Sequence, residues 1–173
     1  MKSLLRPVFI LGISVFLTLV MGCASTKINP NHSMIAKLGQ ASEVYFIRPM
    51  TERPQGMGDN VIQVDVDEEP LLFIQKGRYF GVPLRPGNMD IQIRTIARVG
   101  HASEFKELVR KDRFRFEPGV RHYILLKVVD GEFRGLSYAP VEISEERALE
   151  LLPRLKPEGP LAKQLYRPGN KKK

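Results

Sequence analysis

The chain has 173 residues, and its 27 Lys and Arg against 19 Asp and Glu give a formal net charge of +8 at pH 7. Its single cysteine is Cys23, which excludes an intramolecular disulfide, a cysteine metal cluster and a redox pair. A chain of this length forms one domain and buries enough surface to fold without a disulfide or a metal.

The first residues have the pattern of an export signal. A basic start is followed by an apolar core over residues 8–21, and Gly22 is the small residue that a signal peptidase accepts before its cut. We therefore assign residues 1–22 to a signal peptide. Its removal takes away two basic residues and no acid, which lowers the net charge from +8 to +6.

Residues 19–23 (Leu-Val-Met-Gly-Cys) resemble the bacterial lipobox, in which signal peptidase recognises an aliphatic residue, here Val20, and a small residue, here Gly22, before the cysteine. Met21 departs from the Ala or Ser that is commoner at its position. The resemblance implies diacylglycerol on the Cys23 thiol and an acyl chain such as palmitate on its amino group. Anchoring is then stable, because one acyl chain alone binds a membrane only marginally.

The residues that follow Cys23 bear on location. Ala24 and Ser25 imply, within the lipoprotein resemblance, transport to the outer membrane on the side that faces the periplasm. The alternatives are an uncleaved transmembrane helix over residues 7–26 and ordinary secretory cleavage. A basic envelope protein has anionic neighbours, namely lipid headgroups, lipopolysaccharide phosphates and peptidoglycan carboxylates. We expect no nucleic acid partner.

Residues 23–40 are polar and irregular, and we expect a flexible tether there. Residues 41–143 contain about eight short β-branched or aromatic runs with Pro and Gly between them. Their spacing predicts an antiparallel β-sandwich of the immunoglobulin/transthyretin-like kind. We expect strands near residues 43–48, 61–67, 71–75, 79–82, 89–93, 123–129 and 136–143, and a hairpin within residues 104–116.

Two corners, at residues 84–87 and 116–119, combine Pro with Gly and predict crossings from one sheet to the other. After the second corner, Tyr123 resembles the tyrosine corner of immunoglobulin-like domains, in which the phenol bonds back to the corner backbone. In residues 61–67, strict alternation places Ile62, Val64 and Val66 on one face.

Residues 144–156 predict a short C-terminal helix with Ser144 as its N-cap. Its apolar stripe predicts packing on a sheet face, or docking onto a partner protein. Residues 157–173 are rich in Pro, Gly and Lys, and we expect a disordered basic tail. The terminal lysine resembles that of the major murein lipoprotein, which is joined to peptidoglycan, although no coiled-coil heptads accompany it.

We expect no catalytic residues and no metal site. His32, His101 and His122 lack the spacing of zinc ligands, and we expect each to be exposed or half-buried. An enzyme that acts on envelope glycans would need two carboxylates across a cleft, and Asp65 with Asp67 on one strand face could provide only a poor version of such a pair. The basic residues cluster within the predicted hairpin, as Arg110, Lys111, Arg113 and Arg115. They predict either a contact with an anionic partner or an edge strand protected by charge.

The pattern of the domain is similar to a widespread family of small bacterial lipoproteins of unknown function with a single β-sandwich. The similarity includes the strand that ends in Arg48-Pro49, the Asp65-Val66-Asp67 hairpin, residues 77–80 and the corner at residues 84–87. We expect a lipid-anchored, non-catalytic accessory or binding module that meets an envelope protein complex or peptidoglycan. The alternatives are an envelope-glycan enzyme and an uncleaved membrane-anchored protein.

Overall fold

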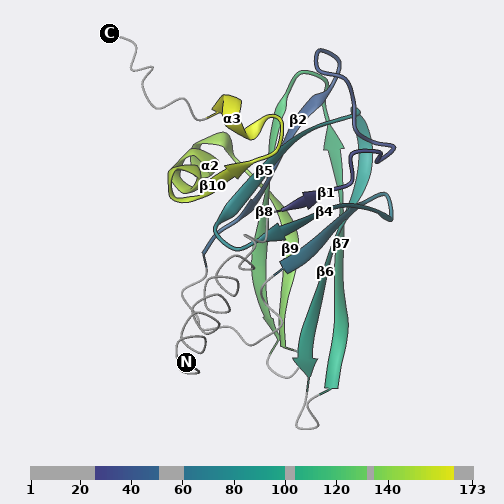
Figure 1. The fold of residues 1–173 in the computed structure, drawn as a ribbon, viewed down its shortest axis with the longest axis vertical. Coiled ribbons are helices and arrows are strands. Elements are labelled where there is room, and N and C mark those ends of the chain that lie inside the picture. Colours follow the sequence, from purple (N-terminus) through teal and green to yellow (C-terminus); the bar gives the residue numbers. More distant parts are fainter. Residues whose placement is uncertain (1–25, 51–60, 100–103, 132–134, 166–173) are drawn as a thin grey trace, which may run out of the picture.

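The computed structural model describes residues 26–50, 61–99, 104–131 and 135–165. Within these residues, ten strands form two five-stranded sheets packed as a sandwich (Figure 1). Sheet A has the order β1 (Lys27–Ile28), β4 (Glu69–Gln75), β3 (Val61–Val66), β6 (Gly87–Val99), β7 (Glu104–Phe116). Sheet B has the order β10 (Lys156–Glu158), β5 (Arg78–Leu84), β2 (Ser42–Arg48), β8 (Arg121–Gly131), β9 (Gly135–Ile143). The predicted mainly-β sandwich is confirmed.

The main core lies between the two sheets. Ile62, Val64 and Val66 of β3 face it and are fully buried, as their alternation predicts. β2 is buried on both faces because it lies in the middle of sheet B. Val44 and Phe46 of β2 pack into the main core, whereas its intervening side chains pack into a second core on the other side of sheet B.

Both Pro-Gly corners connect the sheets. The corner at residues 84–87 joins β5 of sheet B to β6 of sheet A, and the corner at residues 116–119 joins β7 of sheet A to β8 of sheet B. Gly87 and Gly119 have φ of 138° and 72°, a region that glycine adopts without strain. The predicted hairpin within residues 104–116 is wrong: this segment is one strand, paired with β6 along its whole length.

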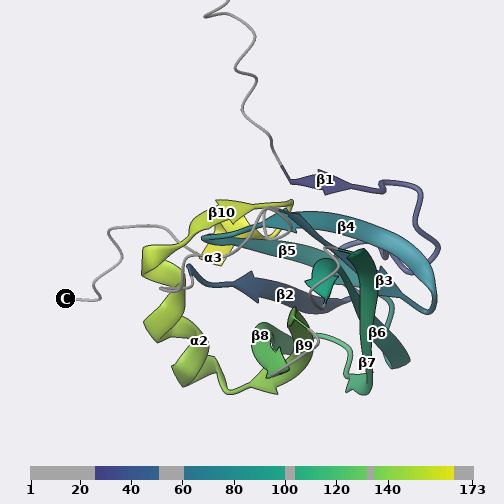
Figure 2. The same ribbon diagram turned by 90° about the horizontal axis from the view of Figure 1, so that it is seen from below.

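The second core is covered by the C-terminal segment (Figure 2). Helix α2 (Glu145–Leu151) begins after Ser144, whose side chain accepts a hydrogen bond from the Arg147 amide. A 3-10 turn, η1 (Leu152–Arg154), follows. The stripe of Ala148, Leu151, Leu152 and Leu155 packs on sheet B, which confirms the predicted packing on a sheet face.

Tyr123 is buried, but the predicted tyrosine corner is wrong. Its phenol donates to Oε1 of Glu145, 3.1 Å away, in the first turn of α2. The reason is that Tyr123 points toward the second core, where its ring stacks on Tyr45 with centroids 5.4 Å apart. Burial, followed by the hydrogen bond to Glu145, raises the pKa of Tyr123 to about 12.

The predicted tail is wrong for residues 157–165. β10 pairs in parallel with β5, and the chain continues into α3 (Ala162–Leu165), with Leu161 fully buried. Gly159, with φ of 88°, lets this segment pass close to β5, since a Cβ there would lie 2.5 Å from the Gly81 carbonyl oxygen. Residues 166–173 lie outside the described residues.

The predicted tether is wrong for residues 27–36, which we call the N-terminal strap. Lys27 and Ile28 form β1 against β4, and the Asn29 amide continues the pairing by donating to the Leu71 carbonyl at 2.8 Å. Farther along, Ser33 donates from its hydroxyl to Glu69 Oε2 at 2.9 Å. Backbone groups and polar side chains hold the strap in place, and its apolar side chains Ile28, Met34 and Ile35 pack against the main core.

Candidate functional site

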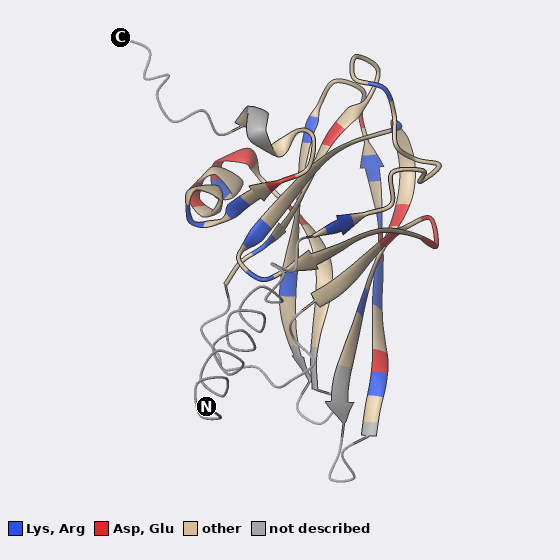
Figure 3. Cartoon of the chain, in the orientation of Figure 1, with Lys and Arg blue, Asp and Glu red and all other residues tan. Residues whose placement is uncertain are grey.

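Basic positions follow one another along β7 (Figure 3), and β7 is the edge strand of sheet A. Phe114 and Phe116 point into the core and are buried. Because side chains alternate along a strand, Arg113 and Arg115 lie on the opposite, outer face of sheet A. The edge position expected for a charge-protected strand is therefore confirmed.

The four basic residues singled out from the sequence do not form one continuous surface. By alternation, Lys111 lies on the outer face with Arg113 and Arg115, whereas Arg110 lies on the side of Phe114. Their contact with an anionic partner stays a prediction.

Asp90 of β6 engages two of these cations. Its carboxylate lies 2.7 Å from Arg113 Nε and 2.7 Å from Lys111 Nζ. The hydrogen bonds from Arg113 and then Lys111 hold the pKa of Asp90 far below its usual range. These ion pairs reduce the positive charge that the outer face presents to a partner.

Asp65 is fully buried although it lies on β3 among outward-facing side chains. Its carboxylate accepts from Arg94 Nε and, at 2.6 Å, from Gln63 Nε2. The hydrogen bond with Asp65 raises the pKa of Arg94. Asp67 adopts φ of 49° in the β3–β4 turn and accepts from the Asp90 amide at 2.9 Å. The carboxylates that a glycan-cleaving site would use are thus both engaged within sheet A.

Two histidines are buried, so the expectation of exposed or half-buried positions is wrong for them. The Nδ1 atom of His32 accepts from the Met34 amide at 3.1 Å, which leaves Nε2 to donate to the Glu69 carbonyl at 3.0 Å. The Nε2 atom of His122 accepts from the Glu117 amide at 3.1 Å.

The other nitrogen of His122, Nδ1, then donates to Glu142 Oε1 at 2.7 Å. Each imidazole therefore connects separate segments of backbone or sheet. His101 lies outside the described residues, and among those described no three His, Cys, Asp or Glu gather as metal ligands.

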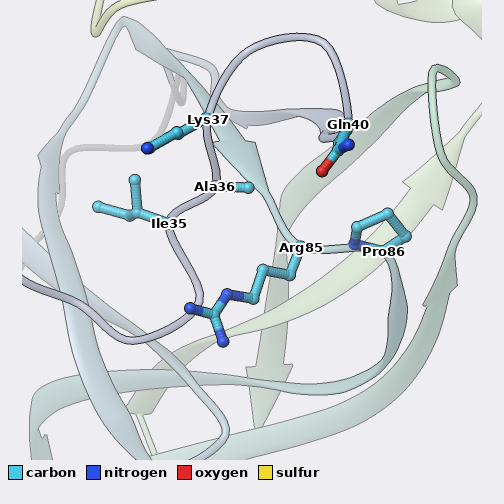
Figure 4. A pocket seen from close by; sticks show the side chains of 6 residues that line it. All are labelled: Ile35, Ala36, Lys37, Gln40, Arg85 and Pro86. Carbon is cyan, nitrogen blue, oxygen red and sulfur yellow. The ribbon is translucent and has the colours of Figure 1, made fainter.

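A hollow of about 500 Å³ opens beside the N-terminal strap (Figure 4). It is formed because Ala36 donates its amide to the Pro83 carbonyl and Arg85 donates its amide to the Met34 carbonyl, which fixes the strap against the β5–β6 corner. Its lining residues are Ile35, Ala36, Lys37, Gln40, Arg85 and Pro86.

Both charged residues of the hollow, Lys37 and Arg85, are positive. In the described part of the chain neither has an acidic partner within ion-pair distance. Lysine and arginine side chains form charge-assisted hydrogen bonds with anionic groups such as phosphates and carboxylates. Sequence reasoning missed this hollow because it assigned Lys37 to a tether.

The predicted lipidation site, Cys23, and the predicted peptidase recognition residues, Val20 and Gly22, lie outside the described residues. None of the helices in the described ranges is both long and apolar enough to cross a bilayer. Comparisons with known protein families, with curated proteins and with solved structures find no match.

Proposed function

We propose that this protein is a lipid-anchored, non-catalytic accessory or binding module of the bacterial envelope, with Cys23 carrying the lipid. The observation that carries the proposal is the lipobox at residues 19–23, placed directly ahead of a single β-sandwich. Only three residues separate Cys23 from Lys27, where β1 begins. Such a chain consists of an anchor followed at once by a compact binding domain.

The surface of the sandwich supports a binding role. The hollow with Lys37 and Arg85 offers two cations to an anionic group, and headgroup phosphates and peptidoglycan carboxylates are such groups in the envelope. Asp65 supports the non-catalytic part of the proposal, because its oxygens already accept from Arg94 and Gln63.

The anchor is tested by growing cells with a clickable palmitate analogue. The native chain should incorporate it, and Cys23→Ser should abolish incorporation because the thiol is the acceptor. Met21→Ala is the matched control, since it changes the lipobox but keeps the cysteine, and it should label as the native chain does. Labelling of Cys23→Ser would contradict the proposal.

The binding role is tested by crosslinking in living cells, followed by mass spectrometry of what is captured. We expect a defined envelope component to be captured by the native chain and to be lost in the double variant Lys37→Ser/Arg85→Ser. Lys127→Ser, which removes an exposed cation from β8, should leave capture unchanged. Release of soluble fragments from purified peptidoglycan by the native protein would instead favour an enzyme.

A further inference from the structure

Five large apolar side chains are exposed on one face of sheet A. Their exposed fractions run from 40% to 60%, although a soluble sheet face normally carries polar residues at such positions. We call this group the outer-face strip; its members are Phe73 of β4, Val61 of β3, Ile96 of β6, and Phe105 and Val109 of β7.

The strand register places these side chains together. Gln63 of β3 lies opposite Phe73 on one side and Arg94 on the other, and Arg94 lies opposite Val109. Residues directly opposite share a face, so this row crosses β4, β3, β6 and β7 on the outer side of sheet A.

The rest of the strip continues from that row. Val61 and Ile96 each lie two residues farther along in the same direction, which returns them to the same face. Phe105 and Val109 lie diagonally across from Ile96, because Ile96 pairs with Glu107, which lies midway between them on β7. Diagonal neighbours are within reach of long and aromatic side chains. The five apolar side chains therefore lie together on one surface, with the polar residues Gln63, Arg94 and Glu107 between them.

The strip adjoins the point where the chain leaves the described structure toward Cys23. Lys27 of β1 is the residue paired with Phe73, so the N-terminal edge of sheet A borders the strip. The four residue-to-residue steps from Cys23 to Lys27 span at most about 14 Å when fully extended. A lipid on Cys23 would therefore hold this edge of the sheet close to the membrane surface, with no room for a long spacer.

The other broad face of the sandwich is already covered. α2, η1 and the residues before α3 pack on the outer side of sheet B (Figure 2). Lys27 is exposed at the margin of the strip, and within the strip Arg94 lies 3.5 Å from Glu107. A cation beside exposed apolar side chains favours an anionic lipid surface. Both observations leave the outer face of sheet A as the side that suits a bilayer.

We infer that the outer face of sheet A lies on the bilayer that holds the Cys23 lipid, with the outer-face strip at the boundary between headgroups and acyl chains. This inference rests on the proposed lipid anchor. It makes the membrane a second contact of the folded domain and fixes how the sandwich is oriented on it. The opposite face, with α2, then points away from the membrane.

The test uses the full lipidated chain in vesicles of phosphatidylethanolamine and phosphatidylglycerol. The chain has one cysteine, which the lipid consumes, so a new cysteine is labelled uniquely with an environment-sensitive fluorophore. Ile96→Cys places the label in the strip, and Leu149→Cys on α2 is the matched control, since the two residues are 58% and 51% exposed. Equal thermal unfolding of the two variants shows that both fold.

We expect the label at residue 96 to emit at shorter wavelength in vesicles and to be quenched by brominated lipid, whereas the label at residue 149 stays as in water. If intact mass shows the lipid on Cys23 while both labels stay as in water, the inference is overturned and the proposed anchor stands. If the lipid is absent, both fail. A wavelength shift at residue 96 without quenching by brominated lipid indicates a second copy of the chain on the strip and also overturns the inference.

Discussion

Replacing Leu161 by alanine tests whether the C-terminal segment is part of the folded domain. Leu161 is fully buried in the second core, and its amide donates to the Gly81 carbonyl at 3.2 Å. Removing a buried leucine side chain costs about 3 kcal/mol, from the lost burial and the cavity that remains. At about 3 °C per kcal/mol for a domain of this size, we expect the Tm to fall by about 9 °C.

The assay is thermal and urea unfolding of the mature chain with Cys23→Ser, which removes the lipid from the measurement. Leu149→Ala is the control, because this leucine is half-exposed on α2, and it should change the free energy of unfolding by less than about 0.5 kcal/mol. Equal stability of Leu161→Ala and Leu149→Ala would refute the packing argument and restore the disordered tail expected from composition.

Three further outcomes follow from single contacts. Hydrogen bonds from the Ser33 hydroxyl and then its amide lower the pKa of Glu69 from its ordinary value of 4.5. The stabilisation from these bonds is therefore present above pH 4.5 and is lost as the pH falls through the pKa of Glu69 in the folded protein. Hydrogen exchange should therefore show the N-terminal strap opening in acid before β2 does. Glu69→Gln, which has no titrating carboxyl, should remove the dependence of strap opening on pH. Gly159→Ala should lower the free energy of unfolding in urea by about 2 kcal/mol or more, because φ is positive and the new Cβ would clash with β5. Gly39→Ala is the control, since φ is positive there but nothing lies within 4 Å, and it should lower the free energy of unfolding by less. An equal loss in the two variants would contradict the clash. The pKa of Tyr123 is raised to about 12, so the stabilisation that its neutral phenol gives the fold is complete below the ordinary tyrosine pKa and is lost as the pH rises toward 12. Tyr123→Phe should therefore show a smaller fall of Tm at alkaline pH than the native chain. An unchanged fall would show that a group other than Tyr123 causes it.

Local patterns in the sequence determined much of the sandwich. The alternation of Ile62, Val64 and Val66 predicted which side chains face the core, since successive residues of a strand point to opposite sides. The corners before Gly87 and Gly119 predicted the crossings between sheets, because their backbone geometry depends on two or three adjacent residues. The same holds for the helix that begins after Ser144.

The site residues were predictable only as residue types. Asp90, which forms ion pairs with Lys111 and Arg113, is more than twenty positions away from them in the sequence. The pairing exists because β6 and β7 meet in one particular register, and a register shifted by one residue would place Asp90 on the other face. The hollow likewise depends on the strap lying against the β5–β6 corner.

Only the tertiary structure decided what happens at the two ends of the domain. β1 and β10 are short, polar segments whose sequences resemble loops, and they become strands because β4 and β5 present unpaired backbone groups at the sheet edges. The outer-face strip arises in the same way, since five exposed residues from four strands meet only after the sheet has formed. The sequence by itself predicted a lipobox and determined the inward-facing residues, because those signals lie between close neighbours, whereas the surfaces of this protein depend on contacts between distant segments.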